Sequence, residues 1–66
     1  MTILLNDKPA EIPEDTSVAS LLSSLGFAPA RVAVERNGEI VPRAAYDHVL
    51  LREGDRLEIV QFVGGG

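Results

Sequence analysis

Short stretches of strand-forming, mostly apolar residues predict strands near both ends of the chain. The first stretch, residues 2–5, is followed by turn residues and then by a second short strand at 10–12. Pro9 and Pro13 bound this second strand. Because proline has no N–H to donate to a sheet, the second strand is expected at a sheet edge.

A helical spacing occupies residues 17–25. Val18, Leu21, Leu22 and Leu25 fall at positions i, i+3, i+4 and i+7, which places them on one apolar face. Residues 14–17 supply candidate N-caps, and Gly26 stands where a glycine commonly ends a helix. We therefore expect one helix, with this face in the core.

The strongest turn signal is Asn37-Gly38, which lies between two strand-forming segments, 31–36 and 39–41. A two-residue type I′ turn needs positive φ at both positions, which Asn and Gly tolerate. The sequence thus predicts a hairpin here. After a turn at 52–55, residues 56–62 predict the last strand.

This order of elements predicts an α+β fold, a mixed sheet with one helix packed across one face. We expect the first and last strands to lie side by side and parallel in the middle of the sheet. Residues 1–66 form a single domain in this interpretation, with a flexible C-terminal tail at 63–66.

Alternation along the last strand suggests a docking surface. If Leu57 and Ile59 point at the helix, then Glu58, Val60 and Phe62 lie on the open face. Exposed Val60 and Phe62 would give a partner protein an apolar contact beside the tail.

Size and composition narrow the possible functions. A domain of 66 residues has room for one thin core and none for an internal active-site cavity, which argues against a self-sufficient enzyme. Ten acidic and six basic residues give a net charge of -4, which disfavours nucleic acid and favours a basic protein surface as partner. With no apolar run of about 20 residues and no leader sequence after Met1, we expect a cytoplasmic protein without a membrane segment.

Metal and nucleotide sites are not predicted. There is no cysteine, and His48 is the single histidine, so metal ligands are lacking and His48 is expected in a solvated loop. No glycine-rich loop precedes a lysine in the pattern of a phosphate-binding loop. Arg36 and Arg43 could contact an acidic partner loop or simply solvate the surface, while Glu53 and Asp55 are typical of a turn.

Three glycines, Gly64, Gly65 and Gly66, end the sequence directly after the last strand. Because glycine lacks Cβ, such a thread fits a narrow enzyme tunnel, where the terminal carboxylate could be activated. Glycine-rich ends are also typical of frayed termini and cloning remnants. The tail alone does not decide between these interpretations.

Three segments are informative when they are taken together: residues 37–43 (NGEIVPR), 53–60 (EGDRLEIV) and 63–66 (VGGG). At these spacings they resemble the ThiS sulfur carriers of thiamine biosynthesis, and the resemblance covers essentially the whole chain. One departure is Asn6-Asp7 in the first hairpin, where relatives often have Asn-Gly. Since Asp tolerates such a turn, the fold is unaffected. The resemblance implies a β-grasp, or ubiquitin-like, fold.

The resemblance also implies a chemistry in which the chain is a protein co-substrate and all catalytic side chains belong to its partners. A ThiF-type adenylyltransferase would adenylate Gly66 with ATP and Mg²⁺, and sulfur from a cysteine desulfurase would convert the adenylate to a thiocarboxylate. A ThiG-type thiazole synthase would then take up this sulfur. Gly64 and Gly65 would thread the tail into these enzymes, and Val60 and Phe62 would dock. The chain itself would bind no cofactor and would be a monomer when free.

Two other functions remain open. A related carrier could serve molybdopterin synthesis or tRNA thiolation, with the same chemistry at Gly66 and a different acceptor. Alternatively, a β-grasp adaptor could bind its partner through the sheet without using its terminus. A residue appended after Gly66 discriminates the last alternative, because only a carrier would lose its activity.

Overall fold

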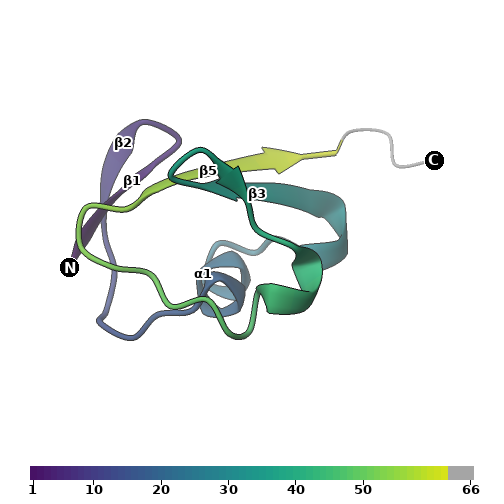
Figure 1. The fold of residues 1–66 in the computed structure, drawn as a ribbon, viewed down its shortest axis with the longest axis horizontal. Helices are drawn as coiled ribbons and strands as arrows, with labels where there is room; N and C mark the ends of the chain where they lie inside the picture. Colours follow the sequence, from purple (N-terminus) through teal and green to yellow (C-terminus); the bar gives the residue numbers. More distant parts are fainter. Residues whose placement is uncertain (63–66) are drawn as a thin grey trace.

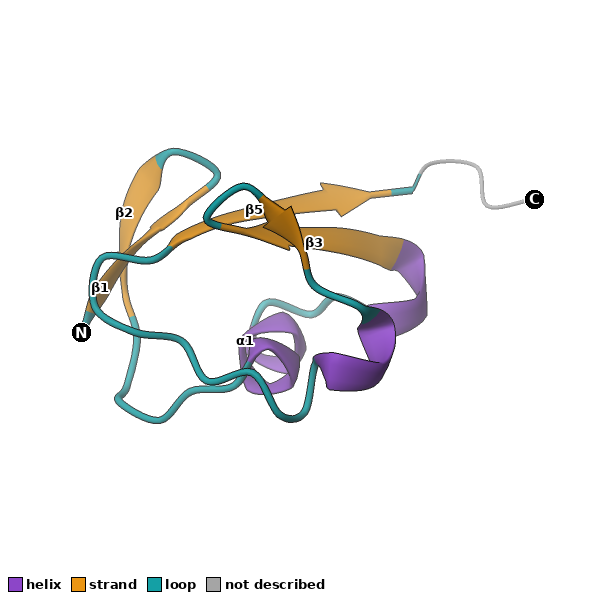
Figure 2. Cartoon of the chain, in the orientation of Figure 1, coloured by secondary structure: helices purple, strands orange, loops and turns teal. Residues whose placement is uncertain are grey.

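Five strands form one mixed sheet in the order β2-β1-β5-β3-β4 in the computed structural model, which describes residues 1–62 (Figure 1). The strands are β1 (Thr2–Leu5), β2 (Lys8–Glu11), β3 (Val32–Arg36), β4 (Glu39–Ile40) and β5 (Arg56–Gln61). The helix α1 (Val18–Ser24) and two 3-10 turns, Pro29–Arg31 and Arg43–Ala45, complete the elements. Figure 2 shows α1 on one side of the sheet, with no helix over the opposite side within residues 1–62. The predicted α+β arrangement is therefore present.

The parallel pairing of the first and last strands is confirmed. Leu4 lies opposite Arg56 and Leu5 opposite Leu57. Beyond the end of β1, the side chain of Asn6 continues the pairing, because its Oδ1 accepts a hydrogen bond from the Ile59 backbone N–H at 2.8 Å. One side chain thus satisfies a donor of the central strand that would otherwise lack a partner.

Both hairpin turns have the backbone geometry expected from the sequence. Asn37 and Gly38 have φ of 52° and 85°, and Asn6 and Asp7 have φ of 50° and 68°. Positive φ at both central residues matches the right-handed twist of the flanking strands.

The predicted edge position of the second strand is confirmed. Its predicted bounds are wrong, because β2 runs from Lys8 to Glu11 and contains Pro9, which lies opposite Leu4. An edge strand tolerates this proline, since no neighbour on the open side needs its missing N–H.

The helix begins and ends close to the predicted residues. Ser17 is the N-cap, and its Oγ accepts a hydrogen bond from the Ser20 N–H at 3.0 Å. Gly26 follows the helix with φ of 81°. The expectation that Leu25 belongs to the buried face is wrong, because Leu25 is already the C-cap and its side chain is 43% exposed.

The core lies between α1 and the face of the sheet turned towards it. It contains Ile3, Ile12, Val18, Leu21, Leu22, Val32, Val34, Val41, Tyr46, Leu51, Leu57 and Ile59. Tyr46 is buried, and its hydroxyl donates to the Val32 carbonyl at 3.4 Å. The long connection through residues 46–55 runs past the helix before it enters β5 (Figure 1). Within residues 1–62 the core uses one face of the sheet, and the other face carries exposed side chains such as Val60.

Candidate functional site

The end of β5 is the part of the structure nearest in sequence to the glycine tail. β5 pairs with β3 from Leu57 onward, and the last pair is Val32 with Gln61. The backbone N–H of Phe62 then donates to the Arg31 carbonyl at 2.9 Å. Sheet hydrogen bonding therefore fixes the backbone as far as Phe62, and in the sequence only Val63 separates this residue from Gly64.

The open face of β5 carries the predicted apolar side chains. Leu57 and Ile59 are buried against the core, as expected. Val60 and Phe62 are 56% and 50% exposed. Their predicted exposure is confirmed, whereas their predicted role in docking stays a prediction.

A third exposed apolar residue, Ile40 of β4, was missed by the sequence analysis. Ile40 is 69% exposed and lies opposite Glu35, which is on the open face of β3. Phe62 and Ile40 line a shallow groove of about 180 Å³ together with Ala33, Val41, Pro42 and Arg43 among others. The turn at Asn37-Gly38 fixes this register, so following the alternation through the hairpin would have found Ile40. We call Val60, Phe62 and Ile40 the apolar patch.

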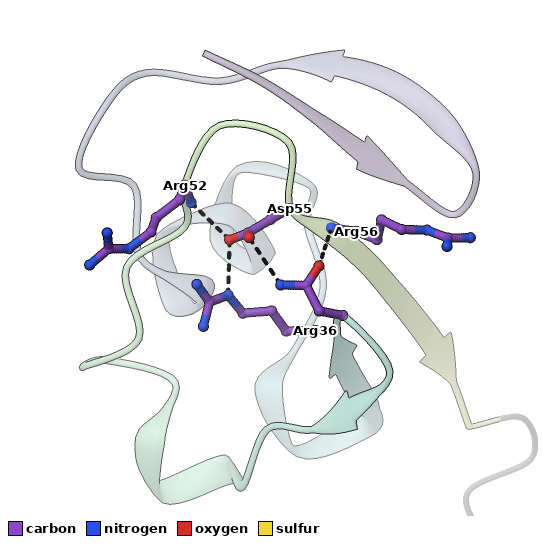
Figure 3. Close-up of polar contacts among 5 residues, drawn as sticks. Arg36, Arg52, Asp55 and Arg56 are labelled. Atoms are coloured by element: carbon purple, nitrogen blue, oxygen red, sulfur yellow. Dashed lines mark hydrogen bonds and ion pairs between the residues drawn. The ribbon is translucent and has the colours of Figure 1, made fainter.

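Asp55 holds the entrance to β5 in place (Figure 3). Its carboxylate accepts hydrogen bonds from Arg36 Nε at 2.9 Å, from the Arg52 N–H at 2.8 Å and from Asn37 Nδ2 at 3.1 Å. Asn37 Oδ1 in turn accepts from the Arg56 N–H at 2.9 Å. The turn that precedes β5 is thereby joined to the β3–β4 hairpin, and this sets the position of the strand that carries the apolar patch.

The pKa of Asp55 lies below its ordinary value. Burial of the carboxyl raises the pKa, but hydrogen bonds from Arg36, Asn37 and the Arg52 backbone, together with the positive charge of Arg36, outweigh that effect. Asp55 is only 7% exposed. Its sequence context indicated turn chemistry, and the structure gives it a larger role.

Both arginines discussed from the sequence contact their own chain. Arg36 pairs with Asp55. Arg43 donates from Nε to the Pro29 carbonyl at 3.1 Å and from Nη2 to the Ala30 carbonyl at 3.5 Å. The Arg43 side chain therefore links the two 3-10 turns near the end of β5.

The predicted roles of Gly64, Gly65 and Gly66 fall on residues outside the described part of the chain, and they stay predictions. His48 is exposed on the connection to β5, as expected. Among residues 1–62, no cluster of side chains has the composition of a metal site. Over the same residues, no helix is long and apolar enough to cross a membrane.

Comparison with known sequences and structures identifies the family. The sequence model of the ThiS family matches residues 3–66. The chain belongs to the ThiS family. The resemblance found in the sequence is therefore confirmed over almost the full length.

Individual relatives agree with this membership. A ThiS protein of thiamine biosynthesis from Geobacter metallireducens, solved by crystallography, superimposes with a TM-score of 0.84 at 40% identity, with both chains covered completely. This match confirms the predicted β-grasp fold of the ThiS-family chain. The sulfur carrier protein ThiS of Bacillus subtilis is 43% identical over 94% of this chain and 96% of its own length.

A second kind of relative is much longer. A protein named thiazole synthase from Magnetococcus marinus is 48% identical over the whole of this ThiS-family chain. The chain spans only 20% of that protein, and 20% of a second thiazole synthase from Paramagnetospirillum magneticum.

Proposed function

We propose that this chain is a sulfur carrier protein that supplies sulfur for thiazole formation in thiamine biosynthesis. The end of β5 is the observation that carries the proposal. Backbone hydrogen bonds reach Phe62, an apolar patch surrounds that point, and Gly64-Gly65-Gly66 follows in the sequence. A partner that binds the apolar patch fixes the position of Phe62, after which the tail begins. The carboxylate of Gly66 is then directed into the active site of that partner.

The chemistry requires activation of that carboxylate. A carboxylate is a poor electrophile, so a ThiF-type adenylyltransferase transfers AMP from ATP to Gly66 and pyrophosphate leaves. The terminal sulfur of a persulfide, which originates from a cysteine desulfurase, then attacks the acyl carbonyl, and AMP leaves. A thiol, supplied by excess cysteine, reduces the resulting acyl disulfide, so that the sulfur stays on Gly66 as a thiocarboxylate and the thiol becomes part of a disulfide. ATP and Mg²⁺ bind to the activating partner, and this chain supplies no catalytic side chain. The consumption of ATP favours the cytoplasm as the place of reaction.

Thiazole synthase is the best supported acceptor. In Magnetococcus marinus one polypeptide named thiazole synthase contains a segment 48% identical to this entire chain. Such a combination favours delivery of sulfur to thiazole formation over molybdopterin synthesis or tRNA thiolation. A purely non-covalent adaptor would need the apolar patch but would have no use for three glycines after it.

An intact-protein mass spectrum tests the proposal. The chain is incubated with a ThiF-type adenylyltransferase, a cysteine desulfurase, ATP, Mg²⁺ and cysteine. We expect a mass increase equal to the exchange of one oxygen for one sulfur, and no increase without ATP. An unchanged mass, with the adenylyltransferase shown to be active on another ThiS protein, would rule out the carrier function.

Replacement of Phe62 by alanine tests the docking role of the apolar patch. Because half of this side chain is exposed, Phe62→Ala should change the melting temperature little. Loss of an aromatic anchor at a protein interface typically costs about 1 to 3 kcal/mol. We therefore expect the KM of the adenylyltransferase for the carrier to rise by about tenfold or more, measured by pyrophosphate release.

Leu50→Ala is the matched control. Leu50 is also about half exposed, at 49%, but it lies beside Ser17 at the start of α1, away from the apolar patch. It should leave the KM unchanged. Equal KM values for the Phe62→Ala and Leu50→Ala variants would show that docking uses another surface.

A further inference from the structure

Phe62 lies just beyond the final β3–β5 pair, Val32 with Gln61, and within residues 1–62 a single hydrogen bond holds its backbone. Its N–H donates to the Arg31 carbonyl at 2.9 Å. In a regular antiparallel sheet, a hydrogen-bonded pair of residues exchanges two such bonds. Here the N–H of Arg31 instead donates to the Ala28 carbonyl at 2.9 Å, within the first 3-10 turn. The position of Phe62 therefore depends on where this turn places the Arg31 carbonyl.

The side chain of Arg43 holds the 3-10 turn Pro29–Arg31. Its Nε donates to the Pro29 carbonyl at 3.1 Å, and its Nη2 donates to the Ala30 carbonyl at 3.5 Å. The last carbonyls of a helical turn lack partners within the turn, and an arginine side chain can bind them. Arg43 itself belongs to the second 3-10 turn, and Figure 2 shows the two turns side by side. Two of the three carbonyls of the first turn thus bind Arg43, and the third binds Phe62.

A buried side chain supports the residue that follows this turn. The hydroxyl of Tyr46 donates to the carbonyl of Val32, the first residue of β3. Tyr46, Arg43 and Phe62 all line the shallow groove beside the apolar patch. Since Tyr46 ties the start of β3 to the core, loss of the exposed Arg43 side chain should loosen the turn without unfolding the domain.

We propose that Arg43 is a positioning residue for the glycine tail; this inference rests on the proposed function. By fixing the turn, Arg43 fixes the Arg31 carbonyl and hence the backbone of Phe62, whose side chain belongs to the apolar patch. A partner that binds a residue already ordered in the free chain does not have to supply the free energy of ordering it. Arg43 therefore favours docking through Phe62, without contacting the partner itself.

Backbone ¹⁵N relaxation of the free chain tests the first step, with Arg52→Met as the control for Arg43→Met. Both variants lose one positive charge, but Arg52 is exposed and contributes to the Asp55 network through its backbone N–H, which methionine retains. For Arg43→Met we expect the order parameter S² of the Phe62 amide to fall from about 0.8 to about 0.6 or lower. The S² of Val60 should stay unchanged, and Arg52→Met should change neither value. An unchanged S² at Phe62 in the Arg43→Met chain would overturn the inference.

Pyrophosphate release by a ThiF-type adenylyltransferase tests the second step. The KM for the Arg43→Met chain should rise by about threefold to tenfold, because the enzyme must now order the backbone of Phe62. The kcat should fall by less than about twofold, since the docked complex is the same. The Arg52→Met chain should keep the KM of the unaltered chain. Equal KM values for the two variants would exclude the positioning role while the carrier function stands.

A double variant separates positioning from direct contact with the enzyme. If Arg43 acts through Phe62, its replacement in the Phe62→Ala chain should raise KM by less than about twofold further, because the side chain that it positions is already missing. If Arg43→Met multiplies KM by the same factor in both chains, Arg43 acts independently of Phe62 and the inference is overturned. If the unaltered chain is not adenylated, the proposed function fails and the role in docking fails with it, whatever the S² of Phe62.

Discussion

A chain with one alanine appended after Gly66 will not form a thiocarboxylate, although its fold will be unchanged. The extra residue moves the terminal carboxylate by up to about 3.5 Å along the thread and adds a Cβ at the point of attack. A displacement of about 1 Å can already cost a hundredfold in rate when reacting groups must be aligned. We expect adenylation to fall by more than a hundredfold, as measured by pyrophosphate release and by intact mass.

Two comparisons sharpen this test. A glycine appended after Gly66 extends the tail equally without adding a side chain, so it separates the effect of length from that of the Cβ. Thermal unfolding should give the same melting temperature for all three chains, because the addition lies beyond the residues that form the sheet. Full thiocarboxylate formation by the alanine-extended chain would contradict a mechanism that uses the Gly66 carboxylate.

Patterns between neighbouring residues allowed most of the fold to be predicted from the sequence. The hairpin at Asn37-Gly38 follows from the tolerance of these two residues for positive φ. Alternation along β5 correctly separated the buried Leu57 and Ile59 from the exposed Val60. Each of these inferences needs only a few consecutive residues, and that is why they succeeded.

Features that join distant segments could not be predicted in the same way. Asp55 and its partner Arg36 are 19 residues apart. Nothing in the sequence of the turn at 52–55 indicates that the Asp55 carboxylate is buried beside the β3–β4 hairpin. Asn6 and Ile59 are 53 residues apart. The placement of Glu35 opposite Glu58 also depends on the register of β3 against β5, which becomes visible only when both strands are placed.

Replacement of Asp55, the buried acid of the turn before β5, by asparagine will cause a large loss of stability. Asparagine has one acceptor oxygen, so its amide group must face at least one of the three donors that Asp55 now satisfies. Leaving buried donors without partners costs about 2 to 3 kcal/mol. For a domain of this size that lowers the melting temperature by about 10 to 20 °C. Asp47→Asn, at an exposed position, should change it by less than about 3 °C.

The Asp55→Asn variant also shows how much the Asp55 carboxylate contributes to the stability of the folded chain at different pH values. The folded pKa of Asp55 is lower than the ordinary value of 3.8, so its ionised form favours the folded chain. This contribution is complete above the ordinary pKa and is lost as the pH falls through the lower folded pKa. The difference in melting temperature between the unaltered chain and Asp55→Asn should therefore be largest near neutral pH and shrink below about pH 4. A difference that stays constant down to about pH 2 would mean that the network acts through shape and packing, with no contribution from the charge that Arg36 and Asp55 share.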